Sequence, residues 1–92
     1  MFDFDISDEL KEVMIKLQKK DKNRLLIINK KIKEIISSNS TTIDHYKNLR
    51  HNLSNYKRVH IDKSFVLLFS VNKEINHILF VKLKHHDEVY TK

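Results

Sequence analysis

The hydrophobic positions in the first 40 residues follow two different periods. Residues 2 to 6 (FDFDI) alternate apolar and polar side chains, which predicts a short strand with one buried face. From Ser7 onward apolar residues recur at i, i+3, i+4 and i+7, which predicts an amphipathic helix that Ser7 caps and that ends near residue 20. Asp21 is the predicted N-cap of a second helix, whose apolar stripe stops in the polar loop SSNSTT. Two helices with so short a join predict an antiparallel hairpin.

The pattern after residue 45 is typical of strands. The segment YKRVHI alternates, so that Val59 and Ile61 face one way while Arg58 and His60 face the other. The next segment, SFVLLFSV, is a continuous apolar run, which predicts a central strand buried on both faces. Polar pairs at residues 62 to 63 and 72 to 73 can turn the chain between successive strands.

The last strand is expected in INHILFVKLK, which alternates again. Strict alternation places one apolar set, residues 79, 81 and 83, on one face. It places Ile78 and Phe80 on the opposite face together with Lys82 and Lys84.

These elements predict an α+β fold in a single domain that spans residues 1 to 92. The expected order is β-α-α-β-β-β: a short N-terminal strand, an antiparallel helical hairpin and a three-stranded antiparallel meander. The helices should cover one apolar face of the sheet and leave the other face open. Ninety-two residues are near the size of one small domain, so a second domain is not expected.

Composition excludes several classes of site. The chain has no cysteine, which excludes disulfides, thiolate chemistry and zinc sites built on sulfur. It has no glycine, and loops that cradle phosphates need glycine to bring the backbone close to the ligand. The acidic N-terminus does not resemble a signal peptide, and no window approaches the roughly 20 apolar residues of a membrane span. We therefore expect a cytoplasmic protein without a membrane partner.

The net charge of +6 is unevenly distributed along the chain. The first twelve residues hold five acids and one lysine, so residues 13 to 92 carry +10. Such a basic region is expected to meet a polyanion. Nucleic acid, an anionic membrane surface and an acidic protein all remain open on charge alone.

The predicted open face of the sheet gathers Arg58 and His60 from one strand with Lys82 and Lys84 from another. Cations on a strand face often do no more than keep it solvated. Here the mixture of types favours chemistry, because arginine and lysine hold phosphates whereas histidine exchanges a proton near neutral pH. If the alternation continues, His86 joins this face.

The chain ends in KLKHHDEVYTK, which offers further candidates. Adjacent residues of a strand point apart, so His85 should face away from His86, and a metal shared by the two is not expected. The phenol of Tyr90 could transfer a proton or stack on an unpaired base, although a lone tyrosine often serves only in packing.

Three features together resemble the RelE/YoeB type of toxin from toxin-antitoxin systems. They are the order β-α-α-β-β-β, the segment YKNLRHNLSNYKRVHI, in which His51 stands where glycine is usual, and the ending HHDEVY. The resemblance covers nearly the whole chain. It implies the toxin of a type II system: a ribosome-dependent mRNA endoribonuclease that uses acid/base catalysis, no metal and no other cofactor. The 2′-hydroxyl of the RNA would attack the adjacent phosphate. A cognate RelB-like antitoxin would bind the toxin in a hetero-oligomer.

The resemblance also assigns roles to residues. Lys84 occupies the position of a catalytic arginine in RelE, and His86 matches the acid/base histidine of other relatives. Val66 stands where many members carry an arginine that holds the scissile phosphate, so other cations would have to substitute. The expected catalytic residues are His86, Tyr90, Arg58 and Lys84, and the expected RNA-binding residues are His60, Lys57, Lys82 and Arg50.

Two other functions stay open at this point. Val66 also fits a toxin without nuclease activity, such as a relative from the ParE branch that inhibits a DNA topoisomerase. The charge alone would equally suit an accessory domain that binds nucleic acid, whose binding would be sensitive to salt.

Overall fold

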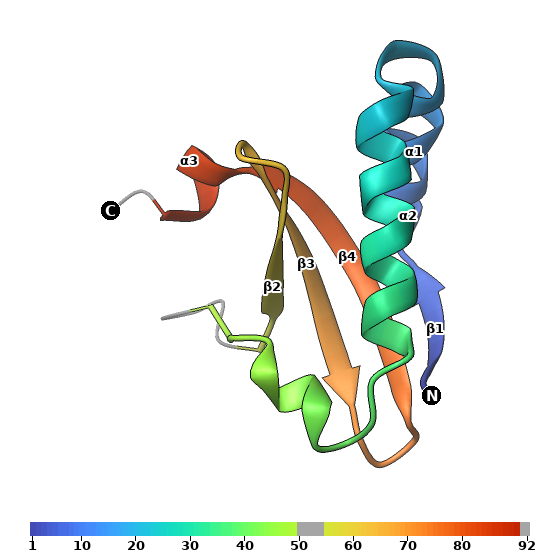
Figure 1. Ribbon diagram of the computed structural model, residues 1–92, viewed down its shortest axis with the longest axis vertical. Coiled ribbons are helices and arrows are strands. Elements are labelled where there is room, and N and C mark those ends of the chain that lie inside the picture. The colour runs from blue at the N-terminus through green and yellow to red at the C-terminus, as the bar shows by residue number, and fades with distance from the viewer. Residues whose placement is uncertain (50–54, 91–92) are drawn as a thin grey trace.

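The structure, a computed structural model, describes residues 1–49 and 55–90, with the side chain of Tyr90 left out. Its elements follow the predicted order, and a short helix is added at each side of the strand region (Figure 1). They are β1 (Asp3–Ile6), α1 (Asp8–Lys20), α2 (Lys22–Ile36), the 3-10 helix η1 (Thr42–His45), β2 (Lys57–Ile61), β3 (Phe65–Asn72), β4 (His77–His85) and α3 (His86–Tyr90). The predicted α+β class is confirmed.

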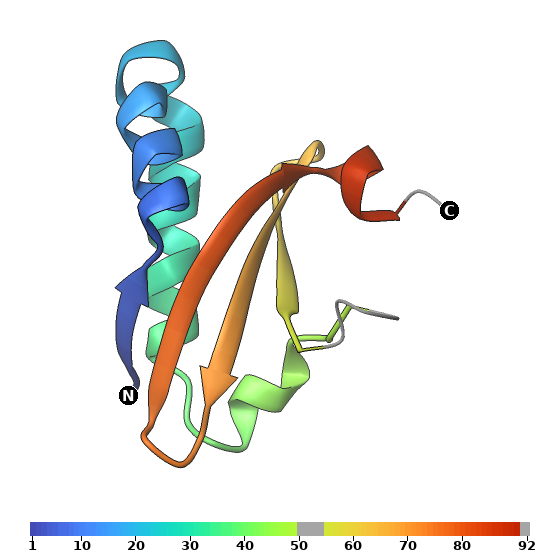
Figure 2. The ribbon, with the colours of Figure 1, turned by 180° about the vertical axis from the view of Figure 1, so that it is seen from behind.

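The two long helices begin at the predicted caps. The Ser7 hydroxyl accepts a hydrogen bond from the Leu10 N–H (3.1 Å), and the Asp21 carboxylate accepts one from the Arg24 N–H (3.0 Å). The Asp21 N–H also donates to the Leu17 carbonyl (2.8 Å), so a single residue ends α1 and begins α2. The helices therefore run antiparallel and side by side along one face of the sheet (Figures 1 and 2).

The sheet has four strands in the order β1-β4-β3-β2. Strands β2, β3 and β4 form the predicted antiparallel meander, but β1 adds to β4 in parallel. The predicted meander is confirmed, and β1, whose neighbour was not predicted, extends it into a mixed four-stranded sheet. Alternation in residues 2 to 6 predicts that this segment is a strand, but it does not say which strand lies beside it. That choice depends on pairing with residues more than 70 positions away.

The main core lies between the helical hairpin and the sheet. Its large side chains from β3 and β4 are fully buried, including Phe69 and Phe80, whose rings lie 5.7 Å apart. Leu10 of α1 and three isoleucines of α2 pack onto them. The buried members are Phe2, Leu10, Ile28, Ile32, Ile35, Ile43, Ile61, Leu67, Phe69, Ile78 and Phe80.

The opposite side of the sheet, which we call the second face, is not left open as expected. Val66 and Leu68 of β3 are 0% and 2% exposed, and they form a small cluster with Leu49 against which Tyr56 and Val89 pack. Two segments supply this cover. Residues 47–49 lie along β2, where the Leu49 N–H donates to the Tyr56 carbonyl (2.9 Å), and α3 folds back at the other end (Figure 1).

A β-bulge at Val81 divides β4 into two registers. Leu68 pairs with Lys82 but the next residue, Phe69, pairs with Phe80, so Val81 is the extra residue. The bulge overturns the strict alternation expected for this strand. Ile78 and Phe80 belong to the main core, whereas Lys82 and Lys84 lie opposite Leu68 and Val66 of the second face.

No helix within the described ranges is long and apolar enough to cross a membrane.

Candidate active site

Strand register arranges the polar residues of the second face in two rows. One row runs His60, Val66, Lys84 across β2, β3 and β4. The neighbouring row runs Arg58, Leu68, Lys82. Strands lie about 4.8 Å apart, so the outer members of each row have Cα atoms about 10 Å apart across a buried apolar residue.

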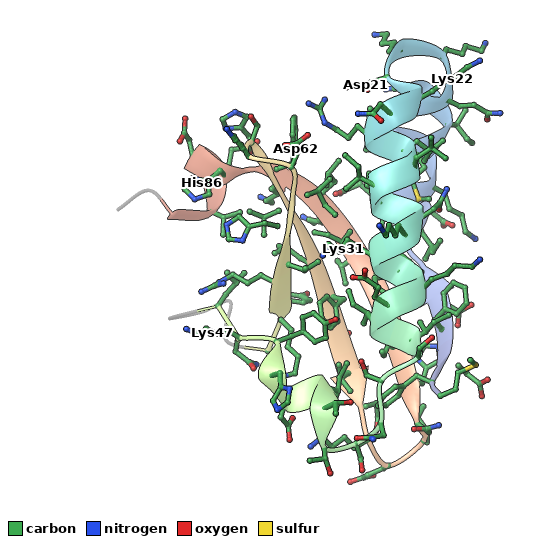
Figure 3. All side chains as sticks on the ribbon, viewed as in Figure 1. Asp21, Lys22, Lys31, Lys47, Asp62 and His86 are labelled. Carbon is green, nitrogen blue, oxygen red and sulfur yellow. The ribbon has the colours of Figure 1, made fainter. Side chains whose placement is uncertain are left out.

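Two histidines meet at the end of these rows. The rings of His60 on β2 and His86 on α3 have centroids 5.7 Å apart, with their planes inclined by 33°. The backbone N–H of His86 donates to the Ser64 carbonyl (2.7 Å), and this bond holds the start of α3 against the turn between β2 and β3. Figure 3 shows His86 beside this turn, which also carries Asp62. Both rings are accessible to solvent: His60 is exposed and His86 is partly buried.

The adjacent histidine points elsewhere, as the parity argument predicts. The His85 ring packs edge-on against Phe65, with centroids 5.5 Å apart, and Phe65 packs against the main core. Its Nδ1 accepts a hydrogen bond from the Asp87 N–H (3.2 Å). The two neighbouring imidazoles therefore belong to opposite faces of the sheet.

The three predicted phosphate-binding residues of the sheet, Lys84, Lys82 and Arg58, differ in the partners that they contact. Lys84 has no ion-pair partner within residues 1–49 and 55–90, and its side chain is partly exposed. The Lys82 ammonium lies 3.9 Å from the Glu9 carboxylate of α1. Arg58 lies on β2, the edge strand of the sheet, and its backbone N–H donates to the Lys47 carbonyl (3.0 Å). The structure thus brings Arg58, His60, Lys82, Lys84 and His86 to one face.

Lys57 is not part of this group. Its ammonium donates to the Tyr46 carbonyl and to the Asn48 side-chain oxygen (both 3.0 Å), and only 12% of its side chain is exposed. These bonds tie the segment after η1 to β2, so Lys57 is positioned for structure and lies on the other side of its strand from Arg58. Arg50 and the side chain of Tyr90, two further predicted site residues, lie outside the part of the chain that is described.

Sequence reasoning missed the residues that hold the turn beside the histidine pair. Asp62 has φ of 49°, in the left-handed region that aspartate tolerates, and its carboxylate accepts hydrogen bonds from the Ser64 N–H (2.7 Å) and from Arg24 Nε (3.0 Å). The Arg24 guanidinium also lies 4.3 Å from the centroid of the Phe65 ring. The bond from Ser64, assisted by Arg24, holds the pKa of Asp62 below its usual value. Residues 24 and 62 are far apart in sequence, and no local pattern reveals their contact.

Ser7 is the second residue whose role the sequence reveals only in part. Besides capping α1, its hydroxyl donates to the Val81 carbonyl, and its N–H donates to the Phe80 carbonyl (2.9 Å). Val81 is the bulge residue, so Ser7 satisfies a carbonyl that the irregular register leaves available. The first turn of α1 thereby helps to fix the register that places Lys82 and Lys84 on the second face.

The arrangement offers proton transfer and anion binding on one surface. Two imidazoles can exchange protons near neutral pH, and nearby cations can stabilise charge on a phosphate. Within the described residues, no group of three or more histidine, aspartate or glutamate side chains is placed to hold a metal ion.

Comparison with known proteins gives three informative similarities, while no protein-family model matches the chain. A protein of Methanocaldococcus jannaschii named "Putative toxin RelE4" is 46% identical over 92 residues, which cover 100% of this chain and 94% of that protein. A chain of the YoeB-YefM complex from Staphylococcus aureus superposes with a TM-score of 0.72 and 22% identity, covering 94% of this chain and 98% of that one. A metal-bound toxin from Helicobacter pylori gives a TM-score of 0.71 at 19% identity, covering 98% of this chain and 100% of that one.

Proposed function

Because the chain belongs to the RelE family of type II toxins, we propose that it is an endoribonuclease that cleaves messenger RNA on the ribosome. The observation that carries the proposal is the pair of His60 and His86, whose rings lie 5.7 Å apart at the end of a basic face. A surface that only binds RNA needs cations but does not need two imidazoles in contact with each other. Acid/base cleavage of RNA needs a proton acceptor and a proton donor besides the cations, and a pair of imidazoles can supply both.

The proposed reaction transfers the phosphate within the RNA. One imidazole takes the proton of a ribose 2′-hydroxyl, and the 2′-oxygen attacks the adjacent phosphorus. The bond from phosphorus to the 5′-oxygen of the next nucleotide breaks, and the second imidazole, as its cation, donates a proton to that oxygen. The products are a 2′,3′-cyclic phosphate and a 5′-hydroxyl. We assign the two proton transfers to His86 and His60, and keep Tyr90 as a further candidate for orienting the substrate.

Cations of the second face would stabilise the extra negative charge of the transition state. Lys84 shares a row with His60 and has no ion-pair partner in the described ranges, so its ammonium is available to a phosphate. Arg58 lies one row further along and can hold the same or the neighbouring phosphate, with Lys82 in support. Preorganised cations of this kind commonly supply a large part of the rate enhancement.

Val66 supports this division of roles. The residue is fully buried in the cluster that it forms with Leu49 and Leu68, so its position contributes packing to the second face and no charge. The basic residues on either side of Val66 in its row, His60 and Lys84, are the nearest replacements for an arginine at that place.

The test is cleavage of a defined message. Purified protein is incubated with ribosomes programmed with an mRNA, and the new ends are mapped by primer extension. The upstream fragment is then treated with a phosphatase alone and with a 2′,3′-cyclic phosphodiesterase followed by the phosphatase, because only the second treatment removes a cyclic phosphate. We expect new ends within the ribosomal A site, with a cyclic phosphate on the upstream fragment. Intact message at high protein concentration would contradict the proposal.

The second candidate function is a toxin that does not cleave RNA, for which Val66 is the observation. The resemblance places a phosphate-binding arginine of many relatives at this position, where this chain has a buried valine. In that case expression would arrest growth while mRNA stays intact, and the purified protein would inhibit a DNA topoisomerase in a supercoiling assay. Salt-sensitive binding to RNA without toxicity would instead indicate an accessory domain.

We also propose that a cognate, RelB-like antitoxin binds the outer side of the helical hairpin. Ile15 and Leu26 are 63% and 67% exposed and stand at matching heights on the two helices, six residues before and five residues after the join at Asp21. Exposed lysines surround them: Lys11, Lys19, Lys22 and Lys30. An apolar pair within a basic surface fits an acidic amphipathic helix, and a structurally similar chain was solved as the YoeB-YefM complex.

Binding of the antitoxin can be tested by changing one apolar residue to an acid. Leu26→Glu should weaken the complex at least 10-fold in calorimetry. The substitution removes an apolar contact, and the new carboxylate repels the acidic residues of the antitoxin. Ile75→Glu is the matched control, since Ile75 is equally exposed (65%) but lies in the turn between β3 and β4. Equal weakening by both variants would place the antitoxin elsewhere.

A further inference from the structure

A shallow pocket opens on the second face one row away from the histidine pair. It has a volume of about 150 Å³ and is lined by Tyr56, Leu68, Val81, Lys82 and Lys84. Its floor is Leu68, which is 2% exposed, and the lysines border it from β4 while Tyr56 borders it from the start of β2. The pocket is therefore apolar at its base and cationic on one side only.

The bulge in β4 builds this pocket. Val81 is the extra residue in the register, so Lys82 follows it onto the same face, and both line the pocket while Phe80 stays in the main core. Bulges next to functional sites commonly re-aim a side chain in this way. The Ser7 hydroxyl holds the Val81 carbonyl, so the pocket wall is attached to the first turn of α1.

The chemistry of the lining points to a flat ring that carries a neighbouring anion. An aromatic side chain and an apolar floor hold a planar base by stacking and burial, and lysines attract the phosphate attached to it. The distance between the pocket and the histidine pair also suits such a ligand. The row of Leu68 and the row of His60 are two residues apart along the strands, which corresponds to about 7 Å.

We propose that this pocket binds the base of the nucleotide next to the scissile phosphate. Tyr56 stacks on that base, and Lys82 and Lys84 contact the scissile phosphate. This subsite rests on the proposed endoribonuclease function, since the phosphate that it positions is the one the histidine pair would act on. Tyr56 is then a specificity-determining residue, and it binds substrate without transferring a proton.

The experiment measures binding separately from cleavage. A fluorescent single-stranded RNA of seven nucleotides whose riboses all carry 2′-O-methyl groups cannot be cleaved by 2′-hydroxyl attack, and its affinity is read by anisotropy. Tyr56→Leu should weaken binding by about 5- to 100-fold, the usual range for the loss of one base stack. Tyr56→Phe keeps the ring and should bind within about 3-fold of the unmodified protein. Thermal melting of each variant confirms that the second face is folded, because Tyr56 also packs beside Leu49.

A second pair of variants tests the phosphate contact. Lys82→Gln should lower the salt dependence of binding by about 0.7 in the slope of log K against log salt, as expected for one contact to a single strand. Lys31→Gln is the matched control, because Lys31 is also paired with a carboxylate, that of Glu34 at 3.3 Å, but lies on α2. Its slope should stay unchanged.

Failure of the pocket and failure of the proposed function give different results. Equal binding by the unmodified protein and Tyr56→Leu, or no binding by the unmodified protein at low salt, would overturn the pocket. Binding that depends on Tyr56, combined with intact message on programmed ribosomes, would keep the pocket and overturn the endoribonuclease. An oligonucleotide with one abasic position provides the final check: its loss of affinity should match that of Tyr56→Leu and should not add to it.

Discussion

The two faces of strand β3 are both buried, but they are buried by different means. Toward the hairpin, Leu67 and Phe69 lie in a large core that two helices cover. On the second face, Val66 and Leu68 are almost as inaccessible, and among residues 1–49 and 55–90 a small set of apolar side chains, those of Leu49, Tyr56 and Val89, packs with them. Cations on β2 and β4 flank them.

The difference separates stability from chemistry within one strand. A large apolar core contributes most of the free energy of folding, which for a domain is only about 5–15 kcal/mol in total. The smaller cluster buries Val66 and Leu68, the central members of the two rows, so the polar side chains of each row lie on β2 and β4, on either side of a buried apolar residue. Substitutions on the first face should therefore change mainly the free energy of unfolding, and those on the second face mainly the proposed activity.

The largest expected effect is on the second face. His86→Ala should reduce cleavage on programmed ribosomes by about 10²- to 10⁴-fold, the usual contribution of a proton-transfer group, while the melting temperature changes little. His85→Ala is the matched control, because its ring lies against Phe65 on the hairpin side and should leave the rate within about 3-fold. Equal losses in both variants would mean that α3 is disturbed and that the contrast between the two histidines is wrong.

Phe69 provides the corresponding test of the hairpin face. Phe69→Ala should lower the free energy of unfolding by about 3–5 kcal/mol, because it leaves a cavity between Tyr46 and Phe80 (5.7 Å from each ring). Leu68→Ala, one residue away on the second face, should cost less, about 2–3 kcal/mol, but should raise KM in the cleavage assay. The measurements are urea unfolding and initial rates at a temperature where both variants are folded, with Phe69→Leu as the milder replacement. A KM that rises equally in Phe69→Leu and Leu68→Ala would contradict the separation.

The sequence predicts the elements of this fold well and their neighbours less well. The caps at Ser7 and Asp21 and the strand character of β3 follow from local patterns, because helix periods and turn residues are local properties. The pairing of β1 with β4 depends on a contact between the two ends of the chain, and the bulge at Val81 depends on a carbonyl that Ser7 satisfies. Neither contact leaves a periodic signal.

For the candidate site, the sequence predicts the group but not its arrangement. Parity along β2 and β4 placed His60 and Lys84 on one face and His85 on the other, as the structure shows. The strand ends at His85, so His86 lies beside His60 because α3 folds back, and the expected continuation of the alternation to residue 86 does not occur. Parity placed Lys82 and Lys84 correctly with Arg58 but wrongly with Phe80, because one inserted residue reverses every later position of a strand. The contact of Arg24 with Asp62 and the closure of the second face by Leu49 and Val89 needed the three-dimensional structure.

A smaller effect should follow from removing the Ser7 hydroxyl, which links the first turn of α1 to the bulge in β4. Ser7→Ala loses the N-cap of α1 and the hydrogen bond to the Val81 carbonyl, which together should lower the free energy of unfolding by about 1–2 kcal/mol. Ser37→Ala is the control, since that hydroxyl only donates back to the exposed Lys33 carbonyl, and it should change stability by no more than about 0.5 kcal/mol. Chemical unfolding in urea measures both. Equal stability of the two variants would show that the bulge holds its register without Ser7.

The smallest expected effect is the pH dependence of the turn that carries the histidine pair. Hydrogen bonds from Ser64 and Arg24 lower the pKa of Asp62 in the folded protein, so the folded state favours the carboxylate more than the unfolded state does. The resulting stabilisation is fully present above the ordinary aspartate pKa of about 3.9 and is lost as the pH falls through the lower, folded value. Asp62→Asn should therefore be less stable than the unmodified protein at pH 6, by up to about 1 kcal/mol for this partly exposed group, and the gap should close near pH 2. If the two unfolding curves stay parallel from pH 6 to pH 2, the Asp62 charge does not hold the turn, and the positions of His60 and His86 are fixed by the Ser64 carbonyl and the sheet alone.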